Sequence, residues 1–251
     1  MTRFSLPGTV RTASYRSPRQ GGLFIDVTTT SIGYVTAGCV GDGSGYKRLK
    51  FQVSKDGVKY NYDLSVTSKP TQFPINMGNG FYTFKIFEHM SGNTYRQLQS
   101  VSRAVTLRSE FMPFTLPTAF CDYATDGPCV RMARRLTRKC RTEKDALDAV
   151  YGWVHRNVKY DKSKTAFLES QKGYVPSPDA TMRELKGVCY DYASLMAAML
   201  RSVGIPCKVI TGYMDGKYHA WVSAYADGKW KLCDPTNGTP SGHTYKRRFI
   251  F

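Results

Sequence analysis

Three residues in the C-terminal half of this chain have types that together could carry out nucleophilic catalysis. Cys189 stands at the start of an apolar pattern with helical spacing, which predicts a helix that ends near Gly204. The unpaired backbone N–H groups of a first helical turn stabilise a thiolate, the nucleophilic form of cysteine. A thiolate catalyst also needs a general base and a carboxylate that orients the base, and His219 and Asp234 can supply them. We therefore expect Cys189, His219 and Asp234 to form a catalytic triad.

The spacing of two turn signals places His219 and Asp234 on one face of a sheet. Three segments with strand character are separated by Asp-Gly pairs, which favour tight hairpins. These segments are residues 207–213, 218–226 and 229–234. If Asp227-Gly228 forms a two-residue turn, Asp234 lies diagonally next to His219 on the same face. A three-residue turn would move Asp234 to the opposite face, so the register of this hairpin tests the triad.

Strand alternation also assigns faces to the neighbouring residues. Trp221 shares the face of His219, and we expect it to flank a substrate groove at the start of the Cys189 helix and to contribute apolar binding area. A purely structural role for Trp221 in packing that helix is an equally good interpretation. Cys207 and Cys233 fall on the opposite face, where small buried side chains are expected, so they are poor candidates for the nucleophile.

Three blocks that contain these residues resemble a known family. The blocks are residues 187–193 (Gly-Val-Cys-Tyr-Asp-Tyr-Ala), 218–221 (Tyr-His-Ala-Trp) and 230–236 (Trp-Lys-Leu-Cys-Asp-Pro-Thr). In type, order and spacing they resemble the signature blocks of the transglutaminase-like superfamily, over roughly residues 140–240. The resemblance implies a papain-like fold and a Cys-His-Asp site that transfers acyl groups from protein or peptide amides. Water as the acceptor would make the chain a cysteine peptidase or amidase, and a lysine-type amine would make it a transglutaminase.

The chain as a whole predicts an α+β fold with two domains. Short strand-like runs separated by turn residues predict a β-sandwich domain at residues 21–110. These runs are residues 23–29, 32–40, 49–54, 58–66, 81–88 and 95–105. A proline-containing connector follows, and residues 111–251 predict the catalytic domain, with helices followed by an antiparallel sheet. Residues 1–20 show little periodicity and are expected to be a flexible arm.

Two further helices are predicted before the Cys189 helix. Pro128 suits the first position of a helix that runs to about Thr137. Thr142 suits the N-cap of the next helix, because Asp145 follows three residues later.

The charge of the chain favours anionic partners. Thirty-six Lys and Arg residues against nineteen Asp and Glu give a net charge of +17. An alternative function follows, in which the triad is vestigial and the basic surface of a cell-surface protein holds an anionic polymer of the cell envelope. Arginines at helical spacing form a basic stripe, which we interpret first as a solvated face. The stripe consists of Arg131, Arg134, Arg135 and Arg138. The sequence contains no recognised nucleic-acid-binding motif, and we do not expect nucleic acid as a partner.

Composition also limits cofactors and location. The seven cysteines form no Cys-x-x-Cys pair, and we expect neither a metal nor another cofactor. No apolar run approaches the roughly 20 residues that a membrane-spanning helix needs. The N-terminus shows no signal peptide, which fits a cytoplasmic protein or an exported one whose leader is not part of this sequence. The N-terminal region resembles β-domains of bacterial surface proteins, so we expect an extracellular or cell-envelope location, with the cytoplasm as the alternative.

Overall fold

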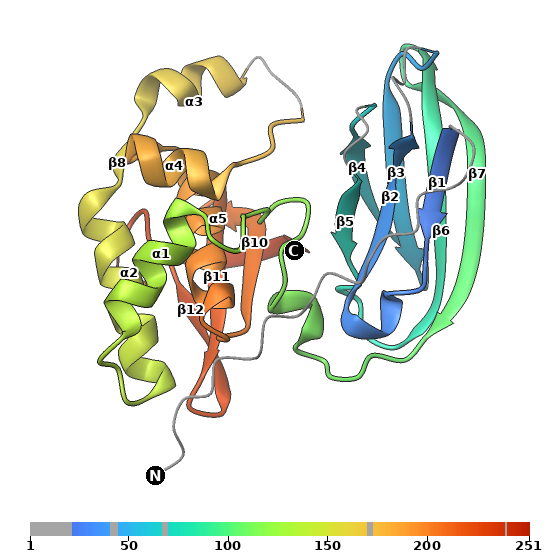
Figure 1. Ribbon diagram of the computed structural model, residues 1–251. Coiled ribbons are helices and arrows are strands. Elements are labelled where there is room, and N and C mark those ends of the chain that lie inside the picture. Colours follow the sequence, from blue (N-terminus) through green and yellow to red (C-terminus); the bar gives the residue numbers. More distant parts are fainter. Residues whose placement is uncertain (1–21, 41–44, 67–69, 170–172, 239) are drawn as a thin grey trace. The chain divides into compact units, whose positions relative to one another are not determined.

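The computed structural model describes residues 22–40, 45–66, 70–169, 173–238 and 240–251 (Figure 1). The described chain divides into two compact units between Pro113 and Phe114. This division lies inside the proline-containing segment in which the sequence predicts the connector. The predicted arm, residues 1–20, lies outside the described residues.

The N-terminal unit consists, in its described part, of a three-stranded and a four-stranded antiparallel sheet. The three-stranded sheet has the order β1-β2-β5, with β1 Gly22–Asp26, β2 Tyr34–Val40 and β5 Thr71–Pro74. The four-stranded sheet has the order β4-β3-β6-β7, with β3 Leu49–Lys55, β4 Val58–Leu64, β6 Gly80–Ser91 and β7 Thr94–Val105. Short 3-10 turns lie at Thr30–Ile32 and Met112–Phe114.

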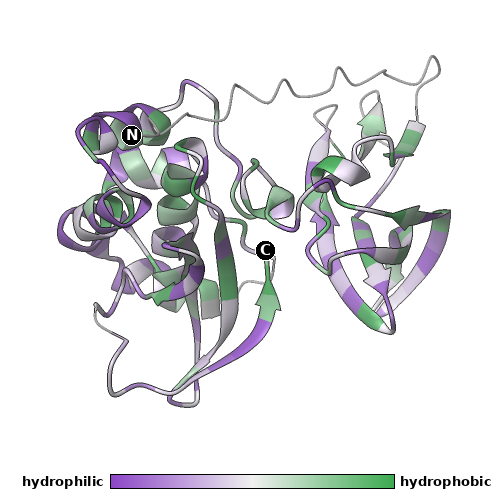
Figure 2. Ribbon diagram, turned by 90° about the horizontal axis from the view of Figure 1, so that it is seen from below, coloured by the Kyte–Doolittle hydropathy of each residue, from purple (hydrophilic) through white to green (hydrophobic). Residues whose placement is uncertain are grey.

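Aromatic side chains join the two sheets of this unit. The ring of Phe73 on β5 lies 4.5 Å from that of Phe51 and 4.9 Å from that of Tyr62, measured between centroids. All three side chains are buried. Buried and solvated residues alternate along β3 and β6, and the ribbons of this unit are banded accordingly (Figure 2). Strands β3 and β6 therefore have one face in the core and one face toward solvent.

The C-terminal unit is a sheet covered by helices. The sheet has the order β12-β11-β10-β13, with β10 Cys207–Met214, β11 Lys217–Ala226, β12 Lys229–Cys233 and β13 Tyr245–Ile250. The helices are α1 Pro128–Thr137, α2 Glu143–Asn157, α3 Lys162–Glu169, α4 Pro178–Glu184 and α5 Cys189–Ser202. A short parallel pair joins β8 Lys159–Tyr160 to β9 Lys186–Gly187. The chain as a whole is thus α+β.

Helix α5 is the centre of this unit. It packs on β10 and β11 on one side and on α1, α2 and α4 on others (Figure 1). Every residue from Asp191 to Arg201 is buried, as expected of a helix that is covered all round. The helix ends at Ser202, and Gly204 shortly after it has a φ of 84°, which glycine adopts readily. None of the helices in the described ranges is both long and apolar enough to span a membrane.

The predicted helices and most predicted strands are confirmed, with corrections at particular elements. Helix α2 has the predicted capping box, in which Thr142 Oγ1 accepts from Asp145 N at 3.0 Å. The first predicted strand ends earlier, because Asp26 Oδ1 accepts from Thr28 N at 2.8 Å and turns the chain. The sequence did not predict α3, α4, β5 or β13.

Arg201 ties α5 to the rest of the unit from a position that is only 2% exposed. Its Nε donates to the carbonyl oxygen of Cys207, and Nη2 donates to that of Phe251, both at 2.9 Å. Its Nη1 donates to the carbonyl oxygen of Leu116 at 2.9 Å and to Thr118 Oγ1 at 3.1 Å. One side chain therefore fixes the helix to the segment before α1, to the start of β10 and to the C-terminus.

Replacing this side chain should destabilise the unit strongly. We expect Arg201→Met to lower the free energy of unfolding by about 3 kcal/mol or more, because it leaves buried carbonyl groups without donors. Urea denaturation followed by circular dichroism measures this change. The control Arg135→Met, at an exposed position on α1, should change stability by no more than about 0.5 kcal/mol. Equal effects of the two variants would contradict the role assigned to Arg201.

Candidate active site

Cys189 is the first residue of α5 and is partly exposed. The carboxylate of Asp191 shapes the turn before it, because its Oδ2 accepts from Val188 N at 2.8 Å. This folds the Asp191 side chain back over Gly187, where an added Cβ would lie 2.5 Å from Asp191 Cβ. Glycine at position 187 is therefore required for the turn that presents the thiol at the N-terminus of the helix.

Asp191 is fully buried and has further partners from another part of the chain. Lys164 Nζ on α3 lies 2.7 Å from Asp191 Oδ2. The hydroxyl of Tyr174 donates to Asp191 Oδ1, and the Lys164 ammonium lies 4.6 Å from the centre of the Tyr174 ring. Burial, followed by the hydrogen bond to Asp191, raises the pKa of Tyr174, so this hydroxyl keeps its proton. The turn before Cys189 is thus anchored to α3 and to the segment around Tyr174.

The hairpins that carry the candidate base have the predicted registers. Met214 pairs with Lys217, and His219 pairs with Gly212. On the next strand Ala226 pairs with Lys229, as a two-residue turn requires. Regular pairing stops at Cys233, and Asp234 instead forms a bridge with Gly238.

Asp234 and His219 meet at the end of this sheet. Asp234 Oδ2 lies 2.8 Å from His219 Nε2, with the carboxyl group 0% exposed and His219 only 6% exposed. The carboxylate of Asp234 also accepts hydrogen bonds from other side chains and from the backbone. Oδ2 also accepts from Tyr245 OH at 2.8 Å and Asn237 Nδ2 at 3.1 Å, and Oδ1 accepts from the backbone N–H groups of Thr236 and Asn237 at 3.0 and 3.1 Å.

These contacts favour the charged forms of both groups. Burial raises the pKa of Asp234, but the hydrogen bond and charge of His219, with hydrogen bonds from Asn237, lower it to about 2. Burial also lowers the pKa of His219, but the hydrogen bonds and charges of Asp234 and Cys189 raise it to about 9. Nε2 is the ring nitrogen bonded to Asp234, and Cys189 is the second side chain whose hydrogen bond and charge raise the pKa of His219. Asp234 and Cys189 are thus the two neighbours that determine the protonation of His219, and the catalytic role of the three residues stays a prediction.

Trp221 packs beneath the imidazole. Its ring is stacked on that of His219, with centroids 6.2 Å apart and planes 20° apart, and it meets the Tyr245 ring edge-on at 5.1 Å. Gly212 makes room for it, since a Cβ there would lie 2.9 Å from the indole and 2.2 Å from the carbonyl oxygen of Lys246. With 2% of its surface exposed, Trp221 has little area to offer a substrate. Of its two predicted roles, the geometry favours packing.

Three residues around the site were not found from the sequence. Tyr245 and Asn237 bond to Asp234, as described above, and His155 on α2 binds the loop that follows it. One ring nitrogen of His155, Nδ1, lies 3.0 Å from the carbonyl oxygen of Pro235, and the ring stacks on Tyr151 with centroids 6.0 Å apart. The Pro-Thr-Asn sequence after Asp234 is a turn signal that could have indicated Asn237. Nothing local marks Tyr245 or His155.

The other cysteines include Cys207 and Cys233, which the sequence placed on the opposite face of the sheet. None of the seven forms a disulfide, and all seven lie within the described residues. Burial raises the pKa of Cys207, and burial with the charge of Asp148 raises that of Cys233 to about 11. Both thiols are therefore protonated at neutral pH, as expected of poor nucleophiles. The described part of the chain contains no group of three or more His, Cys, Asp or Glu side chains placed to hold a metal ion.

Comparison with known proteins finds relatives of this chain. Residues 130–235 match the model of the transglutaminase-like superfamily. An uncharacterised protein of Mycobacterium leprae is 26% identical over 66% of this chain and 59% of its own length. Kyphoscoliosis peptidase of Homo sapiens is 27% identical over 46% of this chain and 19% of its own length. The chain thus spans less than two thirds of either relative. A solved structure from Cytophaga hutchinsonii, named as a candidate cysteine protease, is 18% identical with a TM-score of 0.44, covering 78% of this chain and 74% of that one.

The protonation of His219 can be measured directly. We expect its imidazole to titrate with a pKa of about 9 in NMR spectra, and to titrate lower in Asp234→Asn, where burial is no longer offset by the carboxylate. A folded pKa above the unfolded value near 6.5 makes the bound proton stabilising below about pH 6.5. This stabilisation is lost as the pH rises toward 9, so the free energy of unfolding should fall over that window. The same decline in His219→Gln, or a pKa near 6.5 in the unsubstituted protein, would contradict the arrangement.

Tyr245 should stabilise the charged carboxylate from β13. Burial, and then the hydrogen bond to Asp234, raise the pKa of Tyr245, so the hydroxyl remains a donor. We expect Tyr245→Phe to lower the free energy of unfolding by about 1.5–3 kcal/mol, the range for hydrogen bonds to charged groups. Tyr218→Phe removes the hydroxyl of a tyrosine that is 60% exposed and should have little effect in the same urea titration. If Tyr245→Phe left the free energy of unfolding unchanged, β13 would not support the site.

Proposed function

We propose that the transglutaminase-like region of this chain, residues 130–235, is a cysteine-dependent enzyme that transfers acyl groups from protein or peptide amides. The observation that carries the proposal is the position of His219. Its imidazole is hydrogen-bonded to a buried carboxylate through Nε2 and interacts with the thiol of Cys189. Nucleophile, base and orienting group thus occur in the order that thiol catalysis requires.

The reaction begins once the thiol proton of Cys189 has passed to His219, and the resulting thiolate attacks the carbonyl carbon of the amide. The N–H of Cys189, at the start of α5, stabilises the negative charge that develops on the carbonyl oxygen. The His219 imidazolium donates its Nδ1 proton to the leaving amine, the C–N bond breaks and an acyl-enzyme remains. The neutral imidazole then takes a proton from the acceptor, which attacks the thioester and releases the product and the Cys189 sulfur. Asp234 keeps Nδ1 directed at the thiol throughout.

Two acceptors are compatible with this site. Water gives a peptidase or amidase, and a lysine-type amine gives a transglutaminase. The name of the human relative, a peptidase, supports hydrolysis, and the superfamily as a whole supports either outcome. Assays should therefore measure both peptide release from casein and incorporation of a fluorescent amine into it.

Cys189→Ala should abolish either activity without unfolding the protein. We expect a loss of about a thousandfold or more, because the covalent intermediate cannot form. Thermal unfolding should be nearly unchanged, since the partly exposed thiol lies outside the core. Cys140→Ala, at another partly exposed cysteine near the end of α1, is the matched control and should keep full activity. Undiminished turnover by Cys189→Ala would refute the proposed mechanism.

A second candidate is a binding module with a vestigial triad that holds an anionic polymer. It is supported by the exposed arginines of α1, among which Arg134 donates to the backbone carbonyl of Thr125 and Arg135 to the sulfur of Met132. Alkylation by iodoacetamide separates the two candidates. An enzyme should react faster at Cys189 than at Cys140, and a binding module should show similar rates at both.

We also propose an extracellular or cell-envelope location, with the cytoplasm as the alternative. The proposal is supported by the resemblance of the N-terminal unit to β-domains of bacterial surface proteins. Disulfide bonds would support this location, but the seven cysteines form none. Fractionation of the source cells with an antibody against the chain tests the location.

A further inference from the structure

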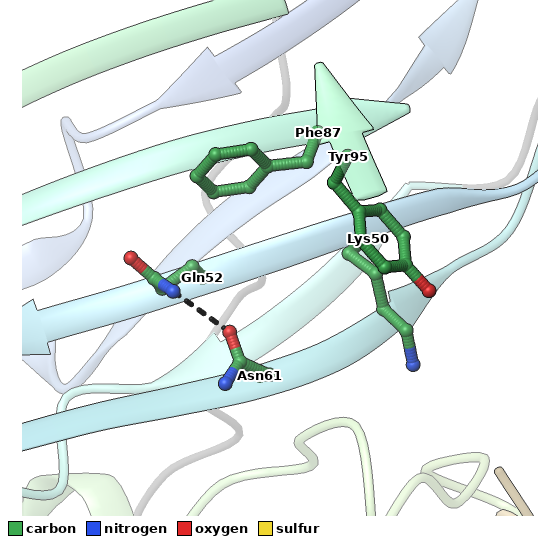
Figure 3. Close-up of a pocket in the computed structure, with 5 residues that line it drawn as sticks. All are labelled: Lys50, Gln52, Asn61, Phe87 and Tyr95. Carbon is green, nitrogen blue, oxygen red and sulfur yellow. Dashed lines mark hydrogen bonds between the residues drawn. The ribbon is translucent and has the colours of Figure 1, made fainter. Parts of the chain in front are cut away.

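The solvated face of the four-stranded sheet carries a hollow of about 330 Å3. It is lined by Lys50 and Gln52 of β3, Asn61 of β4, Phe87 of β6 and Tyr95 of β7 (Figure 3). Binding sites for small ligands commonly combine aromatic walls with a few polar groups in a volume of about 300–1,000 Å3. The hollow therefore has the size and composition of a ligand site, and it lies in the unit that does not contain the candidate triad.

The strand register explains why these side chains meet. Lys50 is the direct cross-strand partner of Phe87, and Gln52 is that of Asn61. Tyr95 pairs with His89, two residues beyond Phe87 on the same face of β6, and the His89 ring contacts it edge-on at 5.1 Å. The two aromatic rings are thus fixed as neighbours on adjacent strands, and both are partly exposed.

The polar part of the hollow suits a ligand with hydroxyl groups. Gln52 Nε2 donates to Asn61 Oδ1 at 2.8 Å, which leaves Gln52 Oε1 as an acceptor and the Asn61 amide nitrogen as a donor for other partners. A hydroxyl group can donate to the first and accept from the second. Figure 3 shows this amide pair beside the two rings, so that apolar and polar groups face the same space.

The charge at the hollow favours an uncharged ligand. Lys50 is its one charged lining residue, and its Nζ lies 2.8 Å from Asp63 Oδ1 on the neighbouring strand. Arg48 Nη2 contacts the same carboxylate oxygen at 3.0 Å, so the Asp63 carboxylate is already engaged by two cations. An anionic polymer would have to compete with the carboxylate of Asp63, whereas a neutral ligand keeps the pair intact.

We propose that this hollow binds an uncharged sugar chain. The C–H faces of the sugar rings pack on Phe87 and Tyr95, and the hydroxyl groups bond to the amides of Gln52 and Asn61. The N-terminal unit would then hold the whole protein on a glycan. This function does not depend on the triad and should persist in Cys189→Ala.

Calorimetric titration of the full chain with cellohexaose, N-acetylated chitohexaose and maltohexaose tests the proposal. We expect at least one of these uncharged hexasaccharides to bind, and Phe87→Ala and Tyr95→Ala each to weaken its affinity about tenfold. Phe81→Ala is the matched control. Phe81 lies on the same face of β6, about 20 Å away along the strand, is 63% exposed and does not line the hollow.

Gln52→Ala, at a solvated position, provides a variant that removes no aromatic packing and should also weaken binding. Thermal unfolding of each variant establishes that it is folded. The proposal is overturned if none of the three sugars binds, or if binding is unchanged in folded Phe87→Ala, Tyr95→Ala and Gln52→Ala. Binding of polyglutamate alone, sensitive to salt, would also overturn it in favour of an anionic ligand.

Discussion

The C-terminal unit depends on the hydrogen bond between Asp234 and His219. A carboxylate that is 0% exposed loses its hydration, which costs several kcal/mol unless other donors replace water. The donors come from separate parts of the fold: His219 from β11, the backbone after Asp234, and Tyr245 from β13. Strand β13 therefore stabilises the buried charge of Asp234 in addition to extending the sheet.

The thiol end of the site rests on a second buried carboxylate. Asp191 accepts from the backbone before Cys189 and is held by Lys164 and Tyr174. Its part is to fix the turn, whereas Asp234 fixes the base. Cys189 and His219 are thus positioned by different carboxylates on different elements, and these elements, α5 and β11, pack on each other.

Local chemistry made much of this arrangement predictable. The Asp-Gly pairs at 215–216 and 227–228 adopt positive φ angles in tight turns, which set the registers and brought Asp234 to the face of His219. The cap at Thr142 is equally local. The helices and strands that the sequence did not predict depend on contacts between distant residues. Strand β13 is rich in basic residues and lies at a sheet edge, and its pairing with β10 has an irregularity at Thr211 and Gly212. No sequence pattern within residues 245–250 identifies β10 as the strand with which they pair.

The electrostatics of the pair also determine the order of proton transfers. Because the pKa of His219 is about 9, the imidazole carries its proton at neutral pH before any substrate arrives. Its first act in the proposed reaction must then be to donate that proton to the leaving amine. Only after this transfer does a neutral imidazole exist, and it appears beside the newly formed thioester, where an acceptor needs a base. In the proposed reaction His219, whose pKa is raised by both Asp234 and Cys189, thus acts as an acid before acylation and as a base after it.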